Sequence, residues 1–446
     1  MAINTLAKFS FSFAAALAVY LLVDGDPQLQ VGLAIFTLIA LLWLSETFHI
    51  TVTALLVPML SILAGIFAPA EAFRQFANPI IFLFLGGFAL AAVMHKQGLD
   101  RLIANHLVRL ARGDTGRAVI LLFIVTALLS MWISNTATTA MMVPLALGLL
   151  ADTRYESNRG SYWFVLLGVA YSANIGGIGT LVGSPPNAIA AANAGISFAE
   201  WIIVGVPAVL IGLPLMILLL WTLFRPKLPA FADKNEAIQQ LDRQQKLTLL
   251  VFGLTVLLWL SSQQLAPLLG VQKGFDSLVA IFAIVLITIL RLAQWKDIER
   301  TADWGVLLLF GGGLTLSAMM QTTGTSVFLA DTIVNLFHDA PLYLLLLAIT
   351  FLIVMLTEFT SNTASSALLI PVFLAVCASM DLPPVLISML IAIGASCAFM
   401  LPVATPPNAI VYGSGFVPQR QMMKIGLRLN LAMILLLSTA AWMLLQ

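Results

Sequence analysis

Residues 134–144 read SNTATTAMMVP, and residues 361–371 read SNTASSALLIP, 227 positions later. Both stretches lie inside long apolar segments. A polar group buried there without a partner costs about 1–3 kcal/mol, so a Ser-Asn-Thr triplet needs partners wherever it occurs. Its occurrence twice, each time with a proline at the same distance, indicates a structural unit that the chain uses two times.

The composition places the chain in a membrane. Of its 446 residues 61% are hydrophobic and 9% are charged, and the mean hydropathy is +1.02. A soluble domain carries about 25% charged residues. The sequence therefore predicts an all-α polytopic membrane protein. The net charge of +1 gives no reason to expect a nucleic-acid partner.

Cysteine and histidine usage argues against a metal centre or a disulfide framework. The two cysteines, Cys377 and Cys397, lie in apolar runs, and the four histidines are scattered without ligand spacing. No catalytic cluster of His, Cys or paired carboxylates supports a membrane enzyme. We therefore expect a protein that is not an enzyme.

Apolar runs of about 17–25 residues or somewhat longer mark membrane-spanning helices. The first run resembles a signal peptide, but we interpret it as a retained helix because the topology works with it in place. Eleven runs are expected to span: 8–24, 29–48, 51–67, 78–95, 160–195, 199–224, 247–265, 275–292, 304–322, 383–412 and 424–445.

Two further apolar regions, 118–152 and 341–379, contain the triplets. The triplets divide them into arms of about 16 residues, which favours re-entrant hairpins with polar tips over full spans. With the N-terminus in the cytoplasm, 19 of the 21 Lys and Arg fall in cytoplasmic segments, and only Arg74 and Lys273 fall outside. The same charge test accepts two short spans in place of each hairpin, so length alone decides between them.

The triplets belong to a longer internal repeat. Residues 86–98 match 312–324, and residues 182–190 match 403–411, in the same order as the triplets and at nearly the same offset. Each repeat has five spans and one hairpin, and because five is odd the second repeat is inverted in the membrane. Inverted repeats with broken helices and a midplane site are typical of secondary transporters.

The repeat defines the expected domains. We expect an N-terminal helix at 1–28, a first repeat at 29–224, a cytoplasmic linker at 225–246 and a second repeat at 247–446. The basic segment 97–117 has apolar residues at helical spacing and favours either an interfacial helix or a loop helix packed on the bundle.

Hairpin tips and proline breaks are the candidate binding elements. The tips offer hydroxyl and amide groups, whose oxygens suit a hard cation and whose donors suit a carboxylate. The paired prolines in GSPPNA (183–188) and ATPPNA (404–409) break a helix and free carbonyls near Gly183 and Ala404. Capping, close packing and mechanical kinks explain each feature singly, but their symmetric combination favours a site.

Glu358 lies three residues before the second triplet, within the apolar segment. An intramembrane carboxylate is a functional candidate. Its symmetry position holds Met131, so we expect it to support the hairpin in preference to coupling protons.

At these residues the chain resembles the divalent anion/sodium symporters, the family that includes the sodium–dicarboxylate cotransporters. The resemblance covers nearly the whole chain and includes both complete triplets. It implies a homodimer and an elevator movement of a transport part against scaffold helices. The scaffold helices would be 29–112 and 247–337, and the transport parts 116–224 and 341–446.

The resemblance also implies ligands, residue by residue. One sodium site would use Ser130, Ser134, Asn135 and Gly183. The other would use Thr357, Thr360, Asn362 and Ala404. The substrate carboxylates would meet Asn135, Thr136, Ser184, Asn362, Thr363, Thr405 and Pro406. The two halves differ at Ser184 and Thr405, which leaves individual contacts there open.

The function so implied is sodium-coupled uptake of C4-dicarboxylates such as succinate across the inner, cytoplasmic membrane, with co-transported sodium and surrounding lipid as partners. A dicarboxylate exchanger and a sodium-coupled sulfate or citrate carrier are the alternatives within the same class. A channel would need a continuous pore, whereas broken helices and hairpins imply an occluded site.

Overall fold

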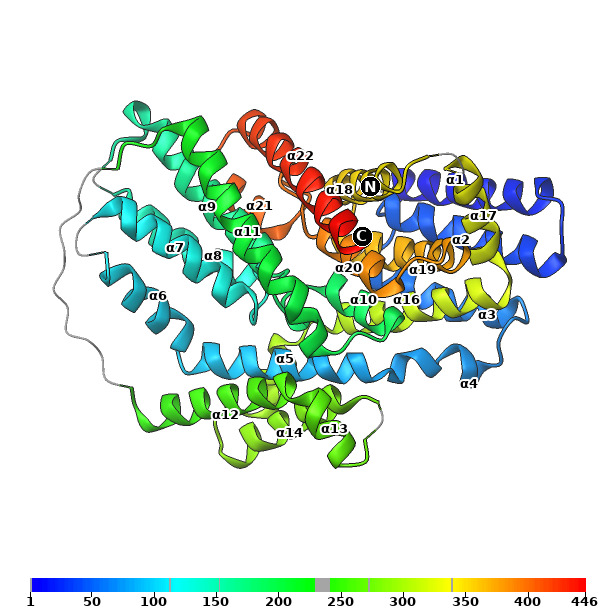
Figure 1. The fold of residues 1–446 in the computed structure, drawn as a ribbon, viewed down its shortest axis with the longest axis horizontal. Helices are drawn as coiled ribbons and strands as arrows, with labels where there is room; N and C mark the ends of the chain where they lie inside the picture. The colour runs from blue at the N-terminus through cyan, green and yellow to red at the C-terminus, as the bar shows by residue number, and fades with distance from the viewer. Residues whose placement is uncertain (1, 112–113, 152, 229–240, 272, 338–339) are drawn as a thin grey trace.

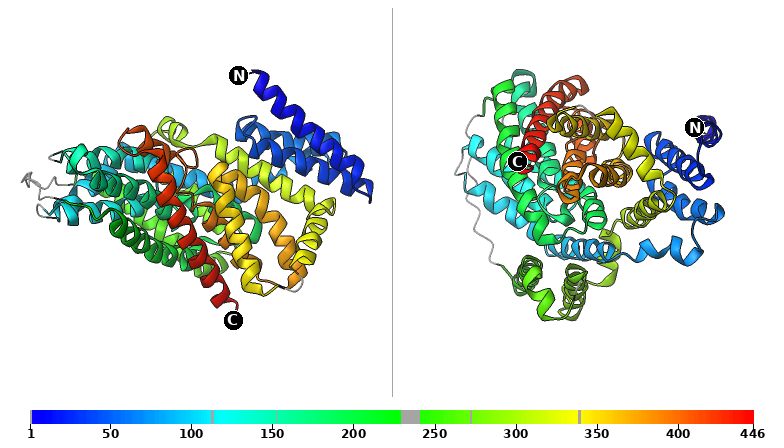
Figure 2. Two further views of the ribbon diagram at one scale, coloured as in Figure 1. Left: turned by 90° about the horizontal axis from the view of Figure 1, so that it is seen from above. Right: turned by 45° about the vertical axis from the view of Figure 1, so that its right-hand side comes forward.

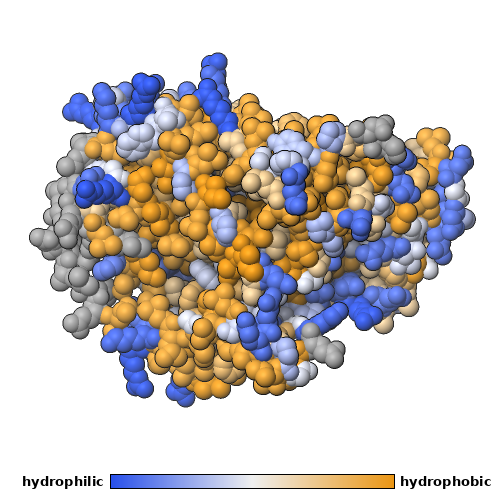
Figure 3. Space-filling view, viewed as in Figure 1, coloured by the Kyte–Doolittle hydropathy of each residue, from blue (hydrophilic) through white to orange (hydrophobic). Residues whose placement is uncertain are grey.

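The computed structural model describes residues 2–111, 114–151, 153–228, 241–271, 273–337 and 340–446, and the regular structure in these ranges is helical. Most long helices run along the longest axis of the molecule (Figure 1). Hydrophobic side chains cover most of the face seen in Figure 3, as lipid contact requires. Leu210 and Leu250, for example, are 67% and 60% exposed. The expected all-α membrane architecture is confirmed.

Each of the eleven expected spans is a helix or a broken helix in the described ranges. They are α1 (Ala2–Leu22), α2 (Pro27–Leu44), α3 (Ile50–Leu63), α5 (Pro79–Lys96), α9 with α10 (Arg159–Gly176, Pro185–Ala194), α11 (Phe198–Phe224), α12 (Arg243–Leu260), α14 (Phe275–Ile289), α16 (Trp304–Thr322), α20 with α21 (Pro384–Ala395, Pro406–Gly413) and α22 (Gln419–Leu444).

Short helices connect these spans. They are α4 (Pro69–Ala72), η1 (Arg74–Ala77), α6 (Leu99–Arg109), η2 (Tyr155–Ser157), η3 (Leu181–Gly183), α13 (Ser262–Leu268), α15 (Trp295–Thr301) and α17 (Thr325–Leu336). Helix α6 lies within the segment 97–117 where a helix was expected. Most of the linker 225–246 lies outside the described residues, and α12 already begins at Arg243.

Length and composition alone qualify eight helices of the described ranges as able to cross a membrane. Two of the eight are α18 and α19, the arms of the second hairpin. Helices α3 and α14 fall short, with 14 and 15 residues. Each of these short helices packs against a long partner, α3 against α16 and α14 against α5.

Two helical hairpins carry the triplets. The first consists of α7 (Thr115–Ser130) and α8 (Asn135–Leu149), and the second of α18 (Leu342–Phe359) and α19 (Asn362–Met380). They enter from opposite ends of the long axis (Figure 1). The expected arm length of about 16 residues holds for the first hairpin, but the second has arms of 18 and 19 residues. Length therefore identifies only the first hairpin, while the second is recognised by its tip, which ends at a central cavity.

Both broken helices resume at the paired prolines. Helix α10 begins with Pro185 and α21 with Pro406. Proline suits the first helical position because the missing N–H would have no partner there. The preceding residues, Ser184 and Thr405, are extended. The breaks predicted from the sequence are therefore confirmed.

The two repeats interlock around these breaks. Helix α10 of the first repeat packs against α19 and α20 of the second, and α21 of the second repeat packs against α8 and α9 of the first. Helix α22 crosses the molecule obliquely and contacts both α11 and α18 (Figure 2). Each half of the central site is therefore held in place by helices of the other repeat.

Candidate functional site

A cavity of about 880 Å³ lies where the two hairpin tips and the two helix breaks meet. Most of the residues that the resemblance assigned to ligands line it. They are Ser134, Asn135, Thr136, Gly183, Ser184, Asn362, Thr363, Ala404, Thr405 and Pro406. The structure thus brings together segments that are more than 220 positions apart in the chain.

The first half-site is built around Asn135. The Ser130 hydroxyl lies 2.6 Å from Asn135 Oδ1 and 2.7 Å from the carbonyl oxygen of Ala173, in α9. Ser130 is fully buried. Three oxygens therefore converge just behind the tip of the first hairpin.

The second half-site repeats this geometry around Asn362. The Thr357 hydroxyl lies 2.6 Å from Asn362 Oδ1 and 2.8 Å from the carbonyl oxygen of Ala395, in α20. Thr357 is also fully buried. The internal repeat therefore extends from sequence to the arrangement of individual atoms.

Each oxygen cluster has fewer hydrogens than acceptors. A hydroxyl has one hydrogen, and here it faces two acceptor oxygens. Hard cations bind clusters of oxygen ligands of this kind. The residues present therefore fit a small hard cation, held by hydroxyl, amide and backbone oxygens.

Close packing at the first break requires glycine at position 183. A Cβ atom at Gly183 would lie 2.6 Å from the carbonyl oxygen of Gly177, and one at Gly177 would lie 2.7 Å from Asn135 Oδ1. Only glycine fits both positions without displacement. The backbone of the break thus lies in close contact with the hairpin tip. Such proximity is needed if a backbone oxygen of the break is to bind the same cation as the tip.

Three of the expected ligands lie away from the cavity wall. Ser130 and Thr357 stand behind the asparagines that they contact. Thr360 points into its own hairpin, where its hydroxyl lies 3.0 Å from the carbonyl oxygen of Leu356 and 2.6 Å from Ser365 Oγ. The structure thus gives the Thr360 hydroxyl a capping role.

Ser184 and Thr405, the expected substrate contacts at the breaks, make different contacts. Ser184 Oγ lies 3.3 Å from Ser396 Oγ. Thr405 Oγ1 accepts from the backbone N–H of Asn408 at 3.3 Å and from Asn174 Nδ2 at 3.1 Å. The asymmetry noted in the sequence is therefore present in the hydrogen bonding.

Two asparagines that the sequence argument passed over brace the breaks. Asn187 Nδ2 donates to the carbonyl oxygens of Gly177 and Thr180, at 2.9 and 2.7 Å. Asn408 Nδ2 donates to Ala398 and Leu401, at 3.1 and 3.0 Å. Both occupy the asparagine position of the repeated PPNA motif, so the signal was present in the sequence.

Glu358 holds the second break from within the hairpin. Its carboxylate accepts hydrogen bonds from the backbone N–H groups of Phe399, Met400 and Leu401 at 2.7, 2.8 and 3.0 Å, and from Asn430 Nδ2 at 2.6 Å. The side chain is fully buried. These bonds join the second hairpin to the second break and to α22, an arrangement that favours structural support.

The cavity extends from the triplets to the helix ends at 46–50 and 301–303. The positive-inside assignment places these ends at the cytoplasmic face. Among the described residues, the cavity is lined by Glu46, His49 and Asp303 as titratable groups, and by no Lys or Arg. A bound anion would therefore meet neutral donors and helix N-termini, without a fixed cationic partner.

Two inverted repeats, two broken helices and a central polar cavity define a polytopic membrane transporter. The model of the citrate transporter family matches residues 40–370. An uncharacterized transporter of Haemophilus influenzae is 50% identical over 425 residues, covering 94% of this chain and 92% of its own.

A sodium-dependent dicarboxylate transporter of Staphylococcus saprophyticus is 33% identical, covering 91% of this chain and 84% of its own. The chain therefore belongs to the citrate transporter family. Its resemblance to the divalent anion/sodium symporters is confirmed.

Solved structures show a similar fold at low sequence identity. The YdaH transporter of Alcanivorax borkumensis superposes with a TM-score of 0.60 at 16% identity, covering 88% of this chain and 98% of its own. MtrF of Neisseria gonorrhoeae gives a TM-score of 0.55 at 14% identity, covering 86% of this chain and 83% of its own.

Proposed function

We propose that the chain couples inward sodium movement to the uptake of C4-dicarboxylates such as succinate. The observation that carries the proposal is the paired oxygen cluster, Ser130 with Asn135 and Thr357 with Asn362, at a cavity whose described lining holds no Lys or Arg. A dianion brought there needs positive charge, because burying an ion without compensation costs several kcal/mol. Sodium in the two clusters would supply it.

The ligand roles follow from this proposal. Asn135 and Asn362 each hold one amide oxygen in a cluster, while their side chains also line the cavity. Thr136, Thr363, Ser184 and Thr405 would offer hydroxyl donors to the substrate carboxylates, and Pro406 would shape the wall. Gly183 and Ala404 would contribute backbone oxygens to sodium.

We further propose an elevator movement in a homodimer in the cytoplasmic membrane. The parts that would move are 116–224 and 341–446, against scaffold helices in 29–112 and 247–337. Support comes from the cavity wall, which combines hairpin tips and breaks with Phe84 and Phe88 of α5 and Val306 of α16. The same cavity reaches the cytoplasmic helix ends, as a substrate-releasing state requires.

Radiolabelled succinate uptake into proteoliposomes tests the proposal. An inward sodium gradient should drive accumulation, and an equal potassium gradient should not. Accumulation that needs internal dicarboxylate but no sodium would replace symport by exchange. Citrate belongs in the same panel because the matching family model is that of citrate transporters, and sulfate belongs there as the remaining anion class.

A further inference from the structure

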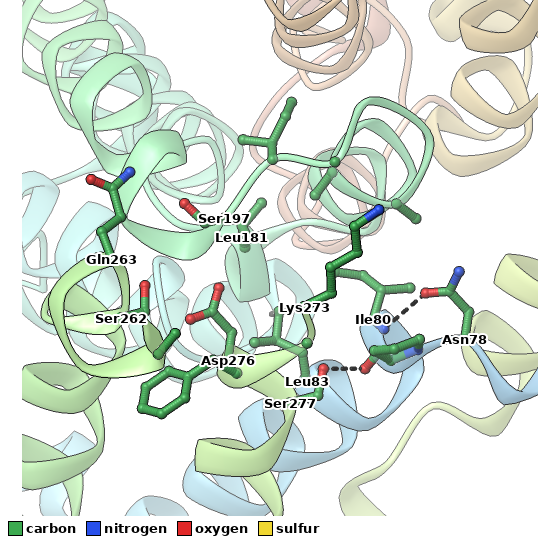
Figure 4. Close-up of a pocket in the computed structure, with 18 residues that line it drawn as sticks. Asn78, Ile80, Leu83, Leu181, Ser197, Ser262, Gln263, Lys273, Asp276 and Ser277 are labelled. Atoms are coloured by element: carbon green, nitrogen blue, oxygen red, sulfur yellow. Dashed lines mark hydrogen bonds between the residues drawn. The ribbon is translucent and has the colours of Figure 1, made fainter. Parts of the chain in front are cut away.

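A second cavity, of about 460 Å³, lies beside the central one and has no role in the site described above. Its wall combines the starts of α5 and α14, the end of α10 and helix α13 (Figure 4). By the positive-inside assignment all of these helix ends lie at the outer face. The cavity therefore sits on the side from which an imported substrate arrives.

Adjacent residues of α5 and of the first break line the two cavities, so the cavities adjoin there. Leu83 of α5 lines the outer cavity, and its neighbour Phe84 lines the central one. Leu181 and Val182 at the first break divide in the same way. Leu83 and Leu181 are each 1% exposed, so the boundary between the cavities is apolar and tightly packed at these two residues.

The two charged side chains that line the outer cavity, Asp276 and Lys273, do not pair with each other. Asp276 Oδ2 accepts a hydrogen bond from the backbone N–H of Phe198 at 2.8 Å, so this carboxylate is engaged with the start of α11. Lys273 is exposed and has no ion-pair partner among the residues that the structure describes. Its amine points away from Asp276 (Figure 4).

Lys273 is also unusual for its side of the membrane. Only two basic residues, Arg74 and Lys273, fall on the outer face in the assigned topology. Helices α5, α11 and α14 start at the same cavity, but α11 and α14 each carry a carboxylate in the first turn, Glu200 and Asp276. Any attraction for an anion at this cavity therefore rests on Lys273, the cationic side chain in its described lining.

We infer that this cavity is an outer vestibule in which a divalent anion is first captured through Lys273, before it reaches the central site. The inference rests on the proposed uptake of a dianion. A single positive charge acts on a dianion twice as strongly as on a monoanion, and salt screens the attraction. Capture by Lys273 should therefore affect substrate arrival at low ionic strength and leave the later steps unchanged.

The test is succinate uptake by Lys273→Gln proteoliposomes at fixed sodium, with ionic strength raised by choline chloride. We expect KM to rise about three- to fivefold at low ionic strength with kcat unchanged, and the difference from wild type to vanish near 1 M salt, where the screening length is about 3 Å. Lys273→Arg should restore the wild-type KM. Arg74→Gln, which removes the other outer basic charge at a position outside the cavity lining, should behave as wild type at every salt concentration.

Equal KM values for Lys273→Gln and Arg74→Gln at low ionic strength would overturn the inference. Accessibility gives a second readout that does not need transport. Ala192→Cys, in the outer cavity, should react with an impermeant thiol reagent from outside, whereas Val182→Cys should react from inside.

The native cysteines, 2% and 0% exposed, should stay silent in this experiment. Labelling of Ala192→Cys only from inside would contradict the vestibule. Outside labelling in a protein without sodium-dependent uptake would instead contradict the proposed function.

Discussion

At the residue scale, the proposed coupling of sodium to substrate depends on the two asparagines at the hairpin tips, Asn135 and Asn362. Each places one amide oxygen 2.6 Å from a buried hydroxyl and its side chain on the cavity wall. Asn135→Ala or Asn362→Ala should raise the sodium requirement and weaken succinate binding together, since one side chain serves both ligands. The loss of one hydrogen-bonding group should cost about 1–3 kcal/mol, or roughly five- to 150-fold in affinity.

Sodium titrations of succinate binding measure both effects. Asn193→Ala is a matched control, because within the described residues the Asn193 side chain bonds only to the carbonyl of Ile189 in its own helix, at 2.9 Å. A tip variant that loses succinate affinity at an unchanged sodium requirement would separate the two roles.

Glu358 provides a residue-scale prediction on stability. Glutamine offers one acceptor oxygen where the carboxylate uses two, and its amide group would face a backbone N–H of the second break. Glu358→Gln should lower the free energy of unfolding by about 2–3 kcal/mol, in the range for hydrogen bonds to charged groups. Thermal unfolding in detergent measures this, with exposed Glu299→Gln as the control. An unchanged Tm for Glu358→Gln would show that the second break is stable without the Glu358 carboxylate.

At the element scale, the hairpins are the decisive structures. If both turn back within the membrane, Arg117→Cys and Arg154→Cys at the ends of the first hairpin should label from the cytoplasm. Ala340→Cys and Asp381→Cys at the ends of the second should label from outside. Labelling from opposite sides within either pair would mean an odd number of membrane crossings between its two residues. It would rule out a hairpin there and cancel the inversion of the repeats.

Hairpins and breaks could be predicted because short local sequence motifs determine them. Proline fixes where α10 and α21 begin, and the polar triplets mark the tips. The arms of the second hairpin could not be separated from spans by length, because 18 and 19 apolar residues satisfy both. Its identity depends on where the tip ends, which is a property of packing between helices.

The candidate site was predictable to the same extent. Residues at the tips and breaks line the cavity because short motifs place them there. The Thr360 hydroxyl bonds within its own hairpin, and Asn174 of the first repeat bonds to Thr405 of the second. Both contacts depend on how the helices pack, and a short sequence motif does not specify that packing. The outer vestibule was missed for the same reason, since it joins helix ends from both repeats.

At the scale of the whole molecule, the cytoplasmic ends of the two repeats are joined by an ion pair. Lys96, at the end of α5, contacts Asp297 of α15. The hydrogen bond from Lys96 holds the pKa of Asp297 below its ordinary value. A carboxyl with a lowered pKa stabilises the folded state above its unfolded pKa, and this contribution fades as pH falls through the folded value.

The Tm difference between wild type and Asp297→Asn should therefore be constant above about pH 5 and shrink below about pH 4. Unfolding scans in detergent across this range measure it. Asp331→Asn, at an exposed position of α17, serves as the control. A difference that grows on acidification would mean that the pair destabilises the fold.

Charge compensation is the central claim for the whole molecule. The cavity offers a dianion no lysine or arginine in the described part of its wall, while two symmetric oxygen clusters lie directly behind the hairpin tips. The cations must then bind before the anion, because they organise the asparagines that it meets.

Binding of succinate to the purified protein, by calorimetry in sodium chloride and in equimolar potassium chloride, tests this claim most directly. We predict saturable binding in sodium and at least tenfold weaker binding in potassium, which corresponds to about 1.4 kcal/mol of coupling. Equal affinity in the two salts would contradict sodium compensation of the bound dianion.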